Sequence, residues 1–159
     1  MILEDVTTEE IIEFGRSITQ EELRYYDDFN VGFILEHSIY IEGIRVNDKL
    51  VGIGGIYKTH GVHSTFHMIK KESQGKGYGN IITKNNVDYA KRNNIPFLFY
   101  ICSKDNIPII KSINKYGDKE VLIYKDKRYS YMPITLKGKI IGLTLPLMVR
   151  IFIKFRRNK

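Results

Sequence analysis

Apolar positions in the first half of the chain follow two different patterns. The segments 7–18 (TTEEIIEFGRSI) and 19–29 (TQEELRYYDDF) each open on a threonine that can cap a helix, continue with acids, and then include apolar residues. From residue 38 the chain changes to β-branched and aromatic runs at 38–46, 49–57 and 64–69, which turn signals separate. We therefore expect two acidic helices followed by an antiparallel meander of three strands.

The second half alternates between the two patterns. A moderately amphipathic segment at 80–92 predicts a helix, and the apolar run 97–103 (FLFYICS) predicts a strand buried on both faces. Another helix is predicted at 105–117, opened by Asp105 and closed by a glycine. Residues 120–134 predict a hairpin that closes the sheet. This order indicates one α/β (α+β) domain.

Composition narrows the class of protein further. The chain has 159 residues, of which 43% are hydrophobic, and a single cysteine, Cys102. This length and composition are typical of a soluble globular domain, and one cysteine excludes both an internal disulfide framework and a cysteine-rich zinc module. The acidic start, without a long apolar core, predicts no signal peptide and a cytoplasmic protein.

Charge is distributed unevenly along the chain. Residues 1–42 contain eleven acids and two bases, whereas residues 43–159 contain seven acids and twenty-three bases. A basic body attracts anionic partners, and the acidic N-terminal part could attract a cationic substrate. Solvated surface charge explains the same distribution equally well.

The segment 74–80 (QGKGYGN) joins the last strand of the meander to the next helix. It lacks the Gly-Lys-Ser/Thr ending of a Walker A loop, and Asn80 stands where a dinucleotide-binding motif needs its third glycine. A purely structural turn is another interpretation. The segment also resembles the Gln/Arg-x-x-Gly-x-Gly/Ala loop of the GCN5-related N-acetyltransferase (GNAT) family, through Gln74, Gly77 and Gly79.

The resemblance extends from about Ser38 to Ile134, where the predicted order of elements is that of the family. Asn106 and Gly117 are similar to the family's asparagine and glycine after the fifth strand. The resemblance implies the GNAT acyl-CoA N-acyltransferase fold, a central mixed and mostly antiparallel sheet flanked by helices. We expect this domain at residues 1–136, followed by a basic extension at 137–159.

The resemblance also implies a site for acetyl-CoA (coenzyme A). Backbone N–H groups at the start of a helix would hold the pyrophosphate, the edge of the preceding strand would pair with the pantetheine amides, and the asparagine would lie near the pantetheine arm. The residues in these roles are Met68, Ile69 and Lys71 on the strand edge, Gln74, Gly75, Lys76, Gly77, Tyr78, Gly79 and Asn80 in the turn, and Asn106 near the arm.

The reaction implied by the resemblance is direct attack of an amine on the acetyl thioester. The position of the family's tyrosine acid is Ile113 here, and the family's phenylalanine is replaced by Asp118. A thiol has a pKa of about 8.5, so the thiolate leaves with little help from a general acid. Tyr116 is the nearest tyrosine in sequence, and Cys102 is interpreted as a core cysteine.

His67 is the best candidate for the general base, because it lies two residues before Ile69 on the same side of the strand. A histidine hydrogen-bonded at a strand face explains it equally well. Weaker candidates are Glu42, Tyr57 and Glu36. The three histidines at 60, 63 and 67 straddle a turn with no carboxylate nearby, which argues against a metal site.

The predicted function is transfer of an acetyl group to a primary amine of an unidentified small-molecule or peptide acceptor. The acidic residues at 9–28 mildly favour a cationic amine. The alternative is a CoA-binding module with little turnover, recruited to a membrane surface or a partner.

The extension at 137–159 contains seven bases and no acid. Thr144 can cap a helix with Pro146 in its first turn. That helix would carry a basic stripe (Arg150, Lys154, Arg157) opposite an apolar face (Leu147, Met148, Ile151, Phe152, Phe155). We expect this face to pack on the domain itself or in a homodimer, ahead of a peripheral membrane contact through 140–159. Nucleic acid is disfavoured because charge alone supports it.

Overall fold

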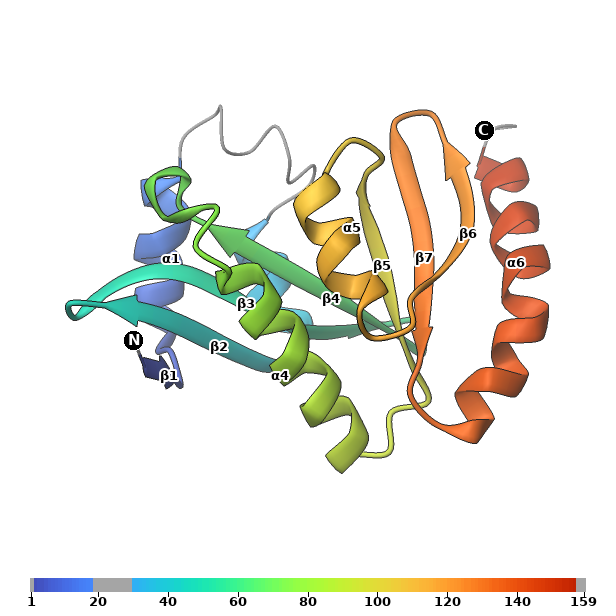
Figure 1. Cartoon of the computed structure of the whole chain (residues 1–159), viewed down its shortest axis with the longest axis horizontal. Helices are drawn as coiled ribbons and strands as arrows, with labels where there is room; N and C mark the ends of the chain where they lie inside the picture. The colour runs from blue at the N-terminus through green and yellow to red at the C-terminus, as the bar shows by residue number, and fades with distance from the viewer. Residues whose placement is uncertain (1, 19–29, 157–159) are drawn as a thin grey trace. The chain divides into compact units, whose positions relative to one another are not determined.

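The computed structural model describes residues 2–18 and 30–156 (Figure 1). The chain forms two compact units, Met1–Asn86 and Val87–Lys159. The division at residue 136 that the sequence suggested stays a prediction. In chain order the elements are β1 (Ile2–Glu4), α1 (Thr8–Ser17), α3 (Val31–His37), β2 (Ser38–Val46), β3 (Lys49–Thr59), β4 (Val62–Ile69), the 3₁₀ turn η1 (Lys71–Ser73), α4 (Tyr78–Arg92), β5 (Phe97–Ser103), α5 (Ile107–Asn114), β6 (Lys119–Tyr124), β7 (Lys127–Pro133) and α6 (Leu136–Arg156).

The first unit contains the antiparallel meander that the sequence predicts. Its strand order is β1-β2-β3-β4, and all three neighbouring pairs are antiparallel. The first predicted helix is confirmed as α1, where Thr7 and Glu10 form a reciprocal capping box, with N···O distances of 2.9 and 3.2 Å. The helix predicted at 19–29 lies outside the described residues. The short strand β1 and the helix α3 are additional elements that the sequence did not predict.

Two apolar clusters lie on the two faces of this meander. Met68 packs with Ile11 and Phe14 of α1, whereas its neighbour Ile69 packs with Ile44 and with the α4 residue Ile82. This alternation is the period-two pattern of a strand buried on both sides. Helix α1 therefore covers one face, and the first half of α4 covers the other.

The second unit contains β5-β7-β6, again with antiparallel pairs. The hairpin of β6 and β7 is confirmed. Two details differ from the predictions. Helix α5 is capped by Asn106 rather than Asp105, because the Asn106 side chain accepts from the N–H of Ile109. Strand β5 is not buried on both faces, since Ile101 is 49% exposed.

Helix α6 begins at Leu136, so the prediction of a helix capped by Thr144 is wrong. The helix continues through Pro146, which has no N–H to donate to the carbonyl of Gly142 four residues earlier. The hydroxyl of Tyr131, from β7, donates to that carbonyl at 3.2 Å instead. Within the described ranges, no helix has the length and apolar character that crossing a membrane requires.

Glycine lets α6 approach its own unit closely. A Cβ atom at Gly138 would lie 1.7 Å from the carbonyl oxygen of Pro96, and one at Gly142 would lie 2.3 Å from the hydroxyl oxygen of Tyr131. Leu145 is buried on the same side of the helix. The extension therefore packs on its own unit through Gly138, Gly142 and Leu145, and the predicted packing face is wrong at Leu147 and Met148, which are 64% and 60% exposed.

Candidate functional site

The glycine turn lies between β4 and α4. Gly75 and Gly77 have φ angles of 76° and 85°, in the left-handed region where a side chain is strained. The side chain of Gln74 donates from Nε2 to the carbonyl of Ile69 at 3.1 Å, which ties the turn to the end of β4. The backbone conformation of the turn therefore explains why Gln74, Gly75 and Gly77 occupy their positions in the motif. Gly79 already lies in the first turn of α4, where its conformation is helical.

The turn presents a row of backbone donors to its surroundings. Among the described residues, the N–H groups from Gly75 to Gly79 donate to no protein acceptor, while the carbonyl of Gly77 accepts from Asn80 and Ile81 at 3.0 and 3.3 Å. A side chain added at any glycine of the turn would meet no atom within 4 Å. Successive N–H groups at the N-terminus of a helix form an anion-binding site. The structure therefore brings the predicted turn residues together as a cradle suited to phosphate.

Met68 and Ile69 lie at the end of β4, as predicted, and pair with β3 on one side. Lys71 lies outside the strand, in the exposed turn η1. The strand ends before it because the chain turns back on itself, with the N–H of Ser73 donating to the carbonyl of Lys70 at 2.8 Å. The predicted strand edge extended to Lys71, whereas β4 ends two residues earlier, at Ile69.

His67 lies beneath α4. Its partner across the strand pair is Gly54, whose other partner is Glu42, so the three residues form one row across β4, β3 and β2. Because directly opposite residues share a face, His67 and Glu42 point to the same face of the sheet. The Nδ2 atom of Asn86, from α4, lies 3.4 Å from Nε2 of His67. The contact places the ring against the helix.

Burial lowers the pKa of His67 to about 4, because the charged imidazolium loses its hydration there. His67 is therefore neutral at pH 7 and a weak proton acceptor. This environment weakens the prediction that His67 is the general base, and it matches the alternative of a histidine held at a strand face.

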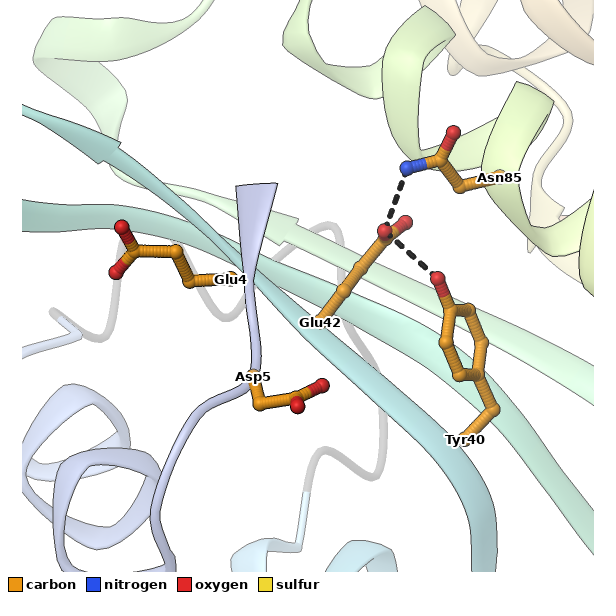
Figure 2. Close-up of a pocket in the computed structure, with 5 residues that line it drawn as sticks. All are labelled: Glu4, Asp5, Tyr40, Glu42 and Asn85. Carbon is orange, nitrogen blue, oxygen red and sulfur yellow. Dashed lines mark hydrogen bonds between the residues drawn. The ribbon is translucent and has the colours of Figure 1, made fainter. Parts of the chain in front are cut away.

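A hollow of about 380 Å³ beside Glu42 is lined by Glu4, Asp5, Tyr40, Glu42 and Asn85. Figure 2 shows these five side chains. Glu42 is only 4% exposed. Its Oε2 atom accepts from the Tyr40 hydroxyl at 2.9 Å and from Nδ2 of Asn85 at 2.7 Å. Desolvation raises the pKa of Glu42, although both hydrogen bonds act in the opposite direction.

The hollow forms where the short strand β1 ends. Glu4 pairs with Gly43, and the chain then leaves β2, so the edge of β2 beside Glu42 has no partner from β1. Arg45 donates from Nε to Glu4 at 3.0 Å, while Asp5 has no ion pair within the part of the chain that the structure describes. Figure 2 shows the Glu4 carboxylate pointing away from Glu42, so Asp5 and Glu42 are the two carboxylates that would favour a positively charged occupant. No group of three His, Cys, Asp or Glu side chains in the described ranges could hold a metal ion.

Sequence reasoning missed Asn85 and Asn86 as site residues. An adjacent pair of asparagines inside a helix is the signal that was available, because asparagine disfavours helix interiors and needs hydrogen-bond partners when buried. Of the weaker base candidates, Tyr57 is partly buried against Phe33 with a raised pKa caused by desolvation, and the side chain of Glu36 is 77% exposed. The structure brings neither to the hollow.

The second unit holds the remaining motif residues. Asn106 caps α5, and its side chain accepts from the N–H of Ile109 at 3.4 Å. Ile113, at the position of the family's tyrosine, is fully buried in the core. Gly117 has a φ angle of 84° after the helix, which explains why glycine occupies this position.

Asp118, which replaces the family's phenylalanine, has a structural partner. Its Oδ2 accepts from Nη2 of the buried Arg128 at 2.7 Å, and Arg128 also contacts Glu120 at 3.1 Å and Ser130 at 2.8 Å. The departure from the family pattern therefore coincides with a buried arginine that needs a carboxylate. Burial raises the pKa of the nearby Cys102 to about 11, so this thiol is not ionised near neutral pH.

Comparison with solved structures identifies the fold. The chain resembles the ribosomal-protein-S18-alanine N-acetyltransferase from Escherichia coli, with 13% identity over 85% of this chain and 94% of that chain, at a TM-score of 0.69. It also resembles yncA from Salmonella typhimurium with its cofactor acetyl-CoA (12% identity, 85% and 94% coverage, TM-score 0.68) and a Bacillus subtilis acetyltransferase in complex with CoA (16%, 84% and 97%, 0.63). These likenesses show the fold and confirm the predicted fold class.

The sequence itself also matches a family model. No curated protein sequence matches the chain. The model of the acetyltransferase (GNAT) family matches residues 3–118, which is more than half of the chain and includes the glycine turn. The phosphate-suited turn at the start of α4, the fold and this match agree, and the chain belongs to the acetyltransferase (GNAT) family.

Proposed function

We propose that the chain transfers an acetyl group from acetyl-CoA to a primary amine by direct attack. The observation that supports this most is the row of N–H groups from Gly75 to Gly79, which donate to no acceptor among the described residues and lie beside open space. Coenzyme A carries a pyrophosphate that such a row would bind without side-chain involvement. Lys76, exposed in the same turn, would add positive charge.

In the proposed reaction the amine nitrogen forms a bond to the acetyl carbon, and the bond from that carbon to sulfur breaks. The sulfur leaves as a thiolate, which needs little assistance because its conjugate acid has a pKa of about 8.5. The absence of a tyrosine at Ile113 is therefore compatible with turnover. The amine's proton passes to a base or to water, and the lowered pKa of His67 makes that residue an inefficient acceptor at neutral pH.

The acceptor is proposed to be a small-molecule or peptide amine. The Escherichia coli relative in the comparison is an alanine N-acetyltransferase of a ribosomal protein, which supports a peptide amine as one choice. The acids on the exposed side of α1, such as Glu9 and Glu13, support a cationic acceptor. The acids predicted at 19–29 lie outside the described residues. A cytoplasmic location stays a prediction.

A second candidate function is CoA binding with little turnover. It is favoured by Ile113, which is fully buried and leaves no acid at the family position. The two candidates share the cofactor and differ in whether an amine releases free thiol from acetyl-CoA.

Gly79 gives the sharpest test of the cofactor site. Its φ angle is helical and a side chain there meets no protein atom within 4 Å, so Gly79→Glu and Gly79→Ala should both fold. An acid in the first turn of a helix is favourable for the helix itself but repels a bound phosphate. We expect calorimetry to show acetyl-CoA binding that Gly79→Glu abolishes and that Gly79→Ala retains in large part. Equal affinity in the Glu variant would refute the proposed site.

A further inference from the structure

Helix α6 presents a stripe of large aliphatic side chains to solvent. Leu136, Ile140, Leu143 and Leu147 are 73%, 61%, 81% and 64% exposed. Their spacing of four, three and four residues places them on one side of the helix. We call these four residues the outer stripe. Single exposed leucines are common on protein surfaces, whereas four in a row along one helix form a patch that indicates an interaction site.

The opposite side of α6 is already occupied. Gly138, Gly142 and Leu145 are buried and face their own unit, with Gly138 against the carbonyl of Pro96. The outer stripe therefore points away from the unit that α6 packs on. This arrangement differs from the face that the sequence predicted, which combined Leu147 with Met148 and residues further along the helix.

The charged residues around the outer stripe indicate which kind of partner would bind it. Lys137 and Lys139 are exposed and, at 100° per residue, lie on either side of Leu136. The sequence then adds Arg150, Lys154 and the bases at 156, 157 and 159, and no acid follows Asp126. Every charge available on this helix is therefore positive.

A second copy of α6 is a poor occupant. The four-three-four spacing suits a helical partner, but pairing two α6 helices would bring together two sets of bases with no acid to neutralise them. An anionic lipid surface offers an apolar layer for the aliphatic side chains and negative headgroups for the lysines, whose stems can extend along the apolar stripe. The helix would lie in the plane of the surface.

We propose that α6 is a membrane-surface helix, which inserts the outer stripe into the headgroup region of an anionic bilayer. The aliphatic side chains of the outer stripe would contact the apolar layer, and the flanking bases would contact the negative headgroups. The proposal does not depend on the acetyltransferase activity, because it rests on α6 alone. It assigns a function to the side of α6 that the domain leaves uncovered.

Vesicle co-sedimentation of the full chain tests the proposal. The probes are vesicles of phosphatidylcholine alone and vesicles of phosphatidylcholine with phosphatidylserine. We expect binding to the anionic vesicles, weaker binding as salt is added, and little binding to the neutral ones. Leu143→Glu should lower the affinity for anionic vesicles by at least roughly tenfold, since it removes a leucine that the bilayer would bury and adds a charge that the headgroups repel.

The matched control is Ile107→Glu, because Ile107 is also an exposed aliphatic residue, 50% exposed, but belongs to α5. This variant should bind anionic vesicles as the unmodified chain does. Thermal unfolding of both variants checks that each is folded. The proposal is overturned if Leu143→Glu binds normally, if neutral and anionic vesicles bind equally, or if sedimentation velocity reveals a dimer that Leu143→Glu dissociates.

Discussion

The partly buried His67 should make the protein lose stability as the pH falls. Burial holds its pKa at about 4 in the folded state, against an ordinary value of 6.5 in the unfolded chain. Between these two pH values the unfolded state takes up a proton that the folded state does not, so stability falls as pH falls through this window. The shift of about 2.5 pKa units corresponds to about 3 kcal/mol at pH 4 and about 2 kcal/mol at pH 5.

Comparison with His67→Gln isolates this contribution from that of other titrating groups. Urea unfolding of both proteins at pH 8, 7, 6 and 5 gives the difference in free energy of unfolding between them. We expect a constant difference between pH 7 and 8, where His67 is neutral in both states. Below pH 6.5 the unmodified protein should lose about 2 kcal/mol relative to the variant by pH 5.

NMR titration of the His67 ring provides an independent check. The ring resonances should stay at their neutral positions down to pH 5. A midpoint near 6.5, together with a pH-independent difference in stability, would refute the reasoning. The same midpoint would restore His67 as a base for neutral pH, so the measurement also bears on the catalytic prediction.

Three further predictions concern packing and buried charge. Gly138→Ala should lower the free energy of unfolding by about 3 kcal/mol, read from urea unfolding, because the added methyl overlaps the Pro96 carbonyl; unchanged stability would show that α6 does not pack there. Asp118→Asn should cost about 3 kcal/mol in the same assay, because it leaves the buried Arg128 short of a carboxylate, and a neutral result would contradict the ion pair. Glu42→Gln should raise the melting temperature at pH 8, since the amide oxygen still accepts hydrogen bonds and no buried charge remains; a lower value would indicate that the carboxylate is preferred.

The glycine turn was predictable because its signal is local. A strand, a turn rich in glycine and a helix follow one another in sequence, and Gln74, Gly75 and Gly77 each have a backbone reason for their identity. The capping box of α1 and the strands of the meander are local in the same way. Strand β1 was missed because three residues are too short to show an alternating pattern.

The acidic hollow was not predictable, because it depends on contacts between distant segments. Glu42 becomes a buried carboxylate only where β1 ends and where Asn85 of α4 lies above it. The early start of α6 was missed for a similar reason. Pro146 argued for a helix beginning nearby, and the hydroxyl of Tyr131 that compensates for it comes from another strand.

The sequence alone also could not explain the departures from the family pattern. From the sequence, Asp118 and Ile113 are only replacements of the family's phenylalanine and tyrosine. The structure shows that Asp118 pairs with Arg128 and that Ile113 is buried in the core. Both positions belong to the second unit and are part of its packing.

Thiol release from acetyl-CoA, measured against a panel of peptide and small-molecule amines, tests the central claim most directly. We predict that at least one amine accelerates the release of free CoA by the unmodified protein, with the acetylated amine as the second product, and that Gly79→Glu abolishes both. Tight binding of acetyl-CoA without release by any amine would contradict the claim of catalysis and favour the CoA-binding module. Amine-dependent release that persists in Gly79→Glu would contradict the assignment of the glycine turn as the cofactor site.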